Sequence, residues 1–230
     1  MTQASFVWPP AAAIFDMDGL MLDTERIYHR TFRKVGVELG YTLSDELLLA
    51  TSGRTFADGY RMLQESLGSD FPLAAFQARW PVLWYEDVAV HGIPLKPGLV
   101  ELLDWLDQER IPKAVATSSY VEEAEFSLRA SGLTERFATV VTADEIVNGK
   151  PAPDIYLLAA ERLQVNPARC LACEDSEPGA LAAAAAGMYT IMVPDTHQPS
   201  AEVAAHAALV VPTLREALLH LIALKELAQQ

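Results

Sequence analysis

Residues 11–19, Ala-Ala-Ala-Ile-Phe-Asp-Met-Asp-Gly, contain a short apolar run that ends in two carboxylates and a glycine. A short apolar run followed by turn residues is typical of a strand buried on both faces of a parallel sheet. Asp16 and Asp18 leave this strand at positions i and i+2, which project to the same side. Gly19 allows a sharp turn of the backbone. The stretch therefore predicts a buried first strand, followed by two carboxylates that can reach one pocket.

Apolar runs alternate with helical patterns over most of the second half of the chain. This alternation predicts βαβ units and a parallel sheet, so we expect an α/β fold with a Rossmann-like core. Apolar stripes predict crossover helices after Pro97 and Pro153, and residues 213–227 read as a closing helix. Residues 195–206 show little periodicity and no catalytic pattern. The expected strands cover residues 11–15, 113–117, 138–141, 169–173 and 189–193.

The section between the first two expected strands breaks the alternation. It has helical patterns and many aromatic residues, among them Phe76 and Trp80, but no strand pattern. We therefore expect a helical cap domain of residues 23–92, inserted into a catalytic core of residues 1–22 and 93–230. The aromatic side chains are expected to form the core of the inserted domain.

Composition limits the function classes. The 230 residues carry a formal net charge of −14, with a pI near 4.7, which opposes binding to nucleic acids and to anionic membranes. The N-terminus lacks the basic segment of a signal peptide, and no apolar run is long enough for a membrane span. Cys170 and Cys173 are too few for a disulfide framework and are expected to be buried thiols. We expect a cytoplasmic protein that acts on a small metabolite as a monomer, with a homo-oligomer left open.

Polar residues suited to phosphoryl transfer follow four of the five expected strands. Ligands of open parallel sheets bind beyond the carboxyl ends of the strands, where these residues should meet. Each signal alone has an ordinary explanation, such as helix capping or a solvated loop, but their succession does not. Two acids this close also imply a divalent cation between them. In chain order the residues are Asp16, Asp18, Thr117, Ser118, Lys150, Glu174 and Asp175.

Together these motifs resemble the haloacid dehalogenase-like hydrolases, in the branch of β-phosphoglucomutase and the small sugar-phosphate phosphatases. The resemblance runs from about residue 11 to 194 and implies a phosphatase that uses Mg²⁺ and acts on a small phosphomonoester, by default a sugar phosphate. The matching motifs are Phe-Asp-Met-Asp-Gly-Leu at 15–20, Thr-Ser at 117–118, Lys-Pro-Ala-Pro-Asp at 150–154 and Glu-Asp-Ser at 174–176.

The resemblance implies a role for each matching residue. Asp16 would be the nucleophile that takes the phosphoryl group. Asp18 would protonate the leaving alkoxide and later activate water. Thr117, with the Ser118 backbone, would bind a phosphoryl oxygen, and Lys150 would neutralise charge on the nucleophile and the phosphoryl group.

The resemblance also implies a metal site and a substrate-facing loop. Mg²⁺ would be held by Asp16, the Asp18 carbonyl and Asp175, with Glu174 in or beside that shell. The inserted helices correspond to the family's cap domain, where Arg54 would contact a remote phosphate or a sugar hydroxyl.

Other activities are weighed against hydrolysis. Dehalogenases of this superfamily have no carboxylate at the position of Asp18, so dehalogenation is disfavoured. Mutases carry a cap-helix histidine at the position of Tyr28; His29 is the neighbouring residue, which favours hydrolysis and leaves a β-phosphoglucomutase-like phosphomutase as the alternative. A phosphate-binding protein without turnover is the remote alternative, because every expected catalytic residue is present.

Overall fold

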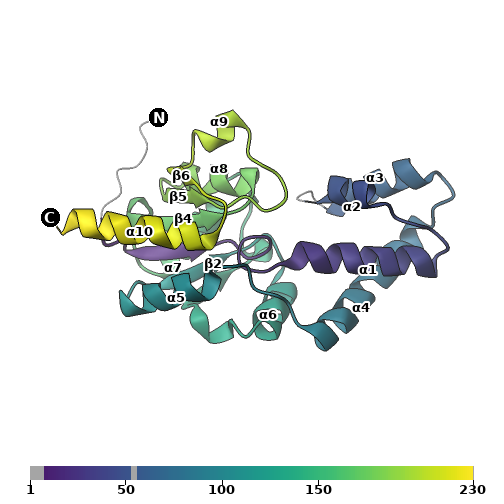
Figure 1. The fold of residues 1–230 in the computed structure, drawn as a ribbon, viewed down its shortest axis with the longest axis horizontal. Coiled ribbons are helices and arrows are strands. Elements are labelled where there is room, and N and C mark those ends of the chain that lie inside the picture. Colours follow the sequence, from purple (N-terminus) through teal and green to yellow (C-terminus); the bar gives the residue numbers. More distant parts are fainter. Residues whose placement is uncertain (1–7, 53–55, 230) are drawn as a thin grey trace. The chain divides into compact units, whose positions relative to one another are not determined.

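The structure is a computed structural model, in which residues 8–52 and 56–229 are described (Figure 1). The chain divides into two compact units. Residues Asp23–Pro94 form one, called the inserted unit, and the segments before and after it form the other, called the core unit.

Among the described residues, the core unit contains a six-stranded sheet in the order β3-β2-β1-β4-β5-β6. All neighbouring strands are parallel, which confirms the expected α/β fold. The strand order reverses between β1 and β4, and such a switch point is where open sheets bind ligands. The strands are β1 Ala12–Phe15, β2 Lys113–Ala116, β3 Thr139–Val141, β4 Cys170–Glu174, β5 Tyr189–Met192 and β6 Leu209–Val210.

The helices of the core unit follow the expected crossovers. Thr213 begins the closing helix, because its side chain accepts a hydrogen bond from the Glu216 amide. β6 and α9 are not anticipated by sequence patterns, since elements this short complete no period. The helices are α5 Leu99–Gln108, α6 Val121–Ala130, α7 Asp154–Arg162, α8 Glu177–Ala185, α9 Ala201–Ala204 and α10 Leu214–Ala228, with short 3₁₀ turns η1 Thr134–Arg136, η2 Ala143–Glu145 and η3 Pro167–Arg169.

The centre of the sheet is closely covered. Every residue of β1 is buried, and the small side chains of Ala182 and Ala183 on α8 belong to the same core cluster as β1 and β4. Cys170 and Cys173 are buried free thiols on β4, as expected.

The inserted unit is made of the helices α1 Thr24–Glu38, α2 Asp45–Thr51, α3 Phe56–Leu67 and α4 Leu73–His91. Phe32 on α1 packs edge-to-face against Phe76 and Trp80 on α4, with ring centroids 5.0 and 5.3 Å away. The indole of Trp80 donates to Thr31 Oγ1 at 3.0 Å, which satisfies its buried N–H. These aromatic rings therefore form a core internal to the unit.

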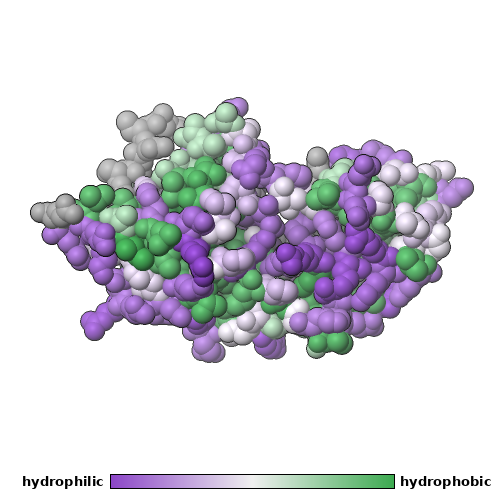
Figure 2. Space-filling view, in the orientation of Figure 1, coloured by the Kyte–Doolittle hydropathy of each residue, from purple (hydrophilic) through white to green (hydrophobic). Residues whose placement is uncertain are grey.

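Figure 2 shows the hydropathy of one face of the molecule. The face drawn in Figure 2 is mostly hydrophilic, and hydrophobic residues form separate patches on it. Within the described ranges, no helix is both long and apolar enough to cross a bilayer.

Candidate active site

The carboxyl ends of β1 and β4 bring three acids together. Phe15 pairs with Cys173, and the next amide, that of Asp16, donates to the Cys173 carbonyl at 3.0 Å. Asp16 therefore leaves the sheet beside the two acids at the end of β4. One carboxylate oxygen each from Asp16, Glu174 and Asp175 lie within 4.8 Å of one another.

Gly19 makes the turn that follows β1. Its φ of +86° lies in the left-handed region, which disfavours residues with a Cβ. A Cβ at this position would lie 2.2 Å from Asp175 Oδ2, closer than any packing distance. The turn thus requires glycine both for its conformation and for the approach of Asp175.

Lys150 reaches this acid cluster from the loop before α7. Its Nζ donates to Asp16 Oδ1 at 2.5 Å, to Glu174 Oε1 at 2.5 Å and to the Ala116 carbonyl at 3.1 Å. Its side chain is 6% exposed, so water screens these contacts little. The lysine predicted for the site therefore sits between two of its carboxylates.

Glu174 is the last residue of β4 and is buried, whereas the expected strand ended at Cys173. Its backbone pairs with Met192 of β5, which extends the strand by this residue. Its Oε2 accepts hydrogen bonds from the Asp175 and Ser176 amides at 3.1 and 3.2 Å and from Ser176 Oγ at 3.1 Å. Glu174 thus fixes the turn between β4 and α8.

Tyr156 on α7 is a further contact of the site. Its hydroxyl donates to Glu174 Oε1 at 2.7 Å, and its ring lies 5.3 Å from Lys150 Nζ. Tyr156 is fully buried. In the sequence it lies on the apolar stripe of an expected crossover helix, where a tyrosine would be interpreted as an ordinary core residue. Only its hydroxyl, which needs a buried partner, could have signalled this contact.

The electrostatics of the cluster favour a bound cation. Burial raises the pKa of Asp16 to about 8; Lys150 opposes this rise and Glu174 adds to it. Burial, followed by repulsion from Asp16 and Glu174, raises the pKa of Asp175 well above its ordinary value. Burial lowers the pKa of Lys150, but the two carboxylates outweigh this and raise it, so the ammonium stays charged. One lysine does not balance these acids, and carboxylate oxygens are the donors that Mg²⁺ prefers.

Asp18 contacts the loop that follows β2. Ser119 Oγ donates to Asp18 Oδ2 at 2.9 Å, and the Ser119 amide donates to Thr117 Oγ1 at 3.0 Å. Thr117 is buried, whereas Ser118 is exposed. Ser119 was not among the expected site residues. Its position two residues after Thr117, typical of a hydroxyl–amide turn, is the signal that identifies it.

Two further residues concern the site: Arg54, which was expected there, and Asp195, which was not. Arg54 lies outside the described residues. Asp195 follows β5, where no catalytic pattern was expected, and forms an ion pair with Lys96. Its position just after a strand is the signal that could have identified it.

Comparisons with known proteins identify the family. The family model of the haloacid dehalogenase-like hydrolases matches residues 10–187. A phosphorylated carbohydrates phosphatase of Thermotoga maritima is 37% identical, over 78% of this chain and 83% of that protein. A fructose-1-phosphate phosphatase of Escherichia coli is 32% identical, over 80% of this chain and 96% of that protein.

Solved structures lead to the same family. A crystal structure from Thermotoga maritima, assigned as a candidate β-phosphoglucomutase, is 33% identical with a TM-score of 0.80, covering 92% of this chain and 98% of that one. CbbY of Rhodobacter sphaeroides in complex with phosphate is 28% identical with a TM-score of 0.69, covering 90% and 96%. The chain therefore belongs to the haloacid dehalogenase-like hydrolases and is a phosphoric monoester hydrolase of that family.

Proposed function

We propose that this enzyme is a Mg²⁺-dependent phosphatase of a small phosphomonoester, by class a sugar phosphate, and that the phosphoryl group is carried on Asp16. The observation that carries the proposal is the position of Asp16, held 2.5 Å from Lys150 and beside Asp175 at the buried end of β1. The phosphorylated carbohydrates phosphatase and the fructose-1-phosphate phosphatase among its relatives support the substrate class.

The reaction takes two steps on Asp16. A carboxylate oxygen of Asp16 attacks phosphorus while the bond to the substrate oxygen breaks, and Asp18 gives its proton to the departing alkoxide. Asp18 then takes a proton from water as that water attacks phosphorus, which frees phosphate and restores the Asp16 carboxylate. Ser119 holds Asp18 in place through its 2.9 Å hydrogen bond.

Other residues hold the phosphoryl group. Thr117 and the Ser118 amide would bind one of its oxygens, next to β2. Lys150 neutralises charge on Asp16 and the phosphoryl group, because its ammonium is buried and already contacts Asp16. Phosphoryl transfer depends chiefly on such positioning and charge neutralisation.

Asp16, Asp175 and the Asp18 carbonyl would hold the Mg²⁺, with Glu174 in or beside this group. Two observations support this fit. The carboxylate oxygens lie close together, and the pKa values of Asp16 and Asp175 are raised, so a nearby cation would stabilise their ionised forms. When bound, Mg²⁺ would supply charge stabilisation for the phosphoryl oxygens.

A β-phosphoglucomutase-like phosphomutase is the second candidate, in which the phosphoryl group passes to a second sugar hydroxyl. The 33% identical Thermotoga maritima structure assigned to that activity supports it. In the inserted unit, His29 Nε2 lies 2.7 Å from Ser52 Oγ, while the neighbouring Tyr28 packs on Trp80 with centroids 5.6 Å apart. Tyr28 has no imidazole and so cannot act as the mutase histidine, which favours hydrolysis. We also propose a cytoplasmic location, which suits two free thiols.

The test measures phosphate release from a panel of sugar and nucleotide monophosphates, with Mg²⁺ and with a chelator. A parallel assay follows conversion of glucose 1-phosphate to glucose 6-phosphate. Mg²⁺-dependent release from a sugar phosphate, absent in Asp16→Asn, is the expected result, and isomerisation without release would replace phosphatase by mutase. Release by a folded Asp16→Asn variant at the wild-type rate would rule out the aspartyl-phosphate.

A further inference from the structure

Asp195 extends toward the acid cluster from the end of β5. It follows Met192, the last residue of that strand, by three positions. A Cβ built on Gly19 would lie 2.2 Å from Asp175 Oδ2 and 3.4 Å from Asp195 Oδ2. Both carboxylate oxygens therefore converge on one point above the turn after β1. Asp195 is thus part of the same site as Asp175, although it comes from another strand.

The two oxygens of Asp195 have different surroundings. Oδ1 pairs with the Lys96 ammonium, and Oδ2 is buried and accepts no hydrogen bond from the described residues. An unsatisfied buried oxygen on a charged group is costly, so a partner for Oδ2 is expected in the functional state. This unsatisfied atom is the observation that points to a ligand.

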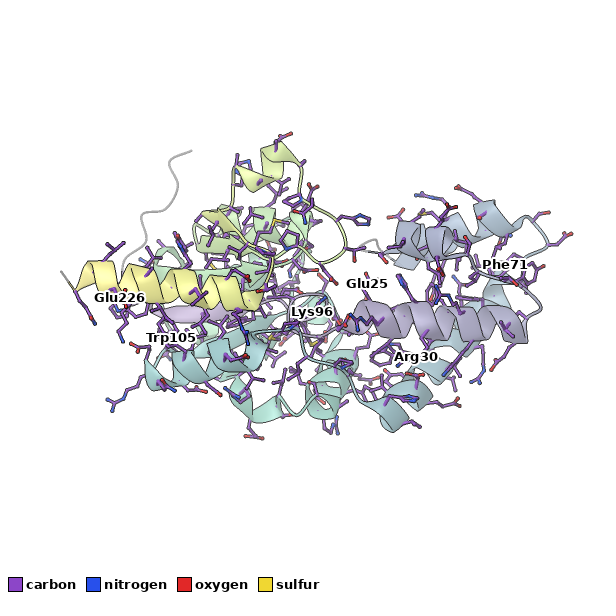
Figure 3. The ribbon with its side chains drawn as sticks, in the orientation of Figure 1. Glu25, Arg30, Phe71, Lys96, Trp105 and Glu226 are labelled. Carbon is purple, nitrogen blue, oxygen red and sulfur yellow. The ribbon has the colours of Figure 1, made fainter. Side chains whose placement is uncertain are left out.

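Lys96 fixes the position of the carboxylate. It lies in the segment before α5 (Figure 3), and its amide donates to the Met21 carbonyl at 2.9 Å in the turn after β1. Its side chain is 19% exposed and that of Asp195 17% exposed, so the ion pair is largely shielded from water. A carboxylate held through one oxygen leaves the other in a defined place.

We propose that Asp195 is a positioning residue for the divalent cation: Oδ2 accepts a hydrogen bond from a water molecule of the hydrated cation, while Lys96 holds Oδ1. The proposal rests on the Mg²⁺ dependence of the proposed function. Mg²⁺ gives up its water reluctantly and keeps several molecules when protein carboxylates bind it. Groups that orient such ligands without touching the metal typically change its affinity by about 10- to 100-fold.

A simpler role for Asp195 is to neutralise Lys96, which is largely shielded from water. The two roles differ in a testable way, because the Lys96–Asp195 pair carries no net charge. Removing Asp195 alone changes the charge beside the cation as well as the acceptor. Removing both partners leaves the net charge unchanged and deletes only the acceptor.

The experiment measures Mg²⁺ affinity without substrate, by calorimetry and by the Mg²⁺-dependent rise in Tm. The variants are Asp195→Ala, Asp195→Asn and the double variant Lys96→Met/Asp195→Ala. We expect the dissociation constant to rise about tenfold in Asp195→Ala and to stay raised in the double variant. It should recover in part in Asp195→Asn, whose amide oxygen is still an acceptor.

The matched control is Asp107→Asn, which breaks an ion pair to the buried Lys113 at the amino end of β2, away from the site. It should lower the metal-free Tm and leave Mg²⁺ affinity unchanged. Wild-type affinity in the double variant would overturn the proposal in favour of charge neutralisation, and wild-type affinity in Asp195→Ala would overturn it by showing that Asp195 has no effect on the cation. If Asp195→Ala does not fold, wild-type affinity in the double variant overturns the proposal. If neither folds, a full loss of affinity, of about tenfold, in Asp195→Asn does so, because that variant keeps an acceptor oxygen and lacks only the charge. A wild-type protein without any Mg²⁺ response would instead refute the metal dependence of the proposed function, and this proposal with it.

Discussion

Lys150 Nζ lies 2.5 Å from Asp16 Oδ1, although 134 positions of sequence separate the two residues. The contact also joins Glu174, so one ammonium serves two buried carboxylates from neighbouring strands. Burial weakens the screening of these charges and makes each one depend on the others. The site therefore behaves as a charge network, and the loss of Lys150 should affect both carboxylates that it contacts.

Replacing Lys150 by methionine tests this network. We expect kcat/KM for a sugar phosphate to fall by about 10²- to 10³-fold, because a buried charge that stabilises the transferring group is lost. Lys113→Met is the matched control, since Lys113 is also a buried lysine paired with an acid but lies at the start of β2. Steady-state kinetics with both variants, checked for folding by circular dichroism, give the comparison. An equal loss in Lys113→Met would show that the effect is one of stability.

The hydrogen bond between Ser119 and Asp18 predicts a smaller, more specific effect. In Ser119→Ala, Asp18 loses a 2.9 Å hydrogen bond, and bonds to charged groups contribute about 1.5–3 kcal/mol. We expect kcat to fall roughly tenfold with little change in KM, because Asp18 moves the proton rather than binding the substrate. Ser118→Ala, at the exposed neighbour, should keep kcat near the wild-type value. A change confined to KM would place Ser119 in binding instead.

The fold was largely accessible from sequence because its sheet is buried on both faces. Buried parallel strands read as continuous apolar runs, and each of the five expected runs coincides with a strand to within a residue or two. β6 was not predicted because it has only two residues, of which Leu209 is half-buried and Val210 is exposed. A strand so short at the edge of a sheet needs little apolar patterning.

The residues of the site also differ in how readily the sequence identifies them. Asp16, Lys150 and Asp175 stand directly after strands or in a distinctive loop motif, so their convergence follows from parallel topology. Tyr156 could not be identified, because whether a helix tyrosine meets an acid depends on how far the helix leans over the sheet. Asp195 is harder still, since its partner Lys96 comes from a segment 99 positions away.

Gly19 predicts a steric link between the first turn and the acids. In Gly19→Ala, the Cβ would collide with Asp175 Oδ2, and a left-handed backbone conformation costs a residue with a Cβ about 1–2 kcal/mol. We expect a loss of Mg²⁺ affinity together with a lower Tm. Gly132→Ala separates the two causes, because Gly132 also has a positive φ, of +73°, but its Cβ would meet nothing within 4 Å. The control should lower Tm alone, and weakened Mg²⁺ binding in it would contradict the steric explanation.

The ion pairs of Asp87 predict how the stability of the inserted unit responds to acid. Its buried carboxylate accepts hydrogen bonds from Arg30 Nε at 3.0 Å and from Lys34 Nζ at 2.8 Å, with Arg30 labelled on α1 in Figure 3. The hydrogen bond from Arg30 is the main cause that lowers the pKa of Asp87 from 3.8 to about 2, against the effect of burial. Because the folded-state pKa is depressed, the stabilisation is fully present above the ordinary pKa and is lost as pH falls through the folded-state value. A shift of this size corresponds to roughly 2 kcal/mol.

The unfolding free energy of the inserted unit should therefore fall between about pH 4 and pH 2 in the wild type. In Asp87→Asn this acid-dependent part should be missing, and the variant should be less stable by roughly 2 kcal/mol at neutral pH, because Arg30 and Lys34 lose their partner. Amide hydrogen exchange in α1 and α4 measures this stability locally. Asp45→Asn is the control, since the Asp45 side chain pairs with Arg33 but is 82% exposed, and it should titrate like the wild type. A wild-type acid response in Asp87→Asn would mean that another carboxylate governs the acid sensitivity of this unit.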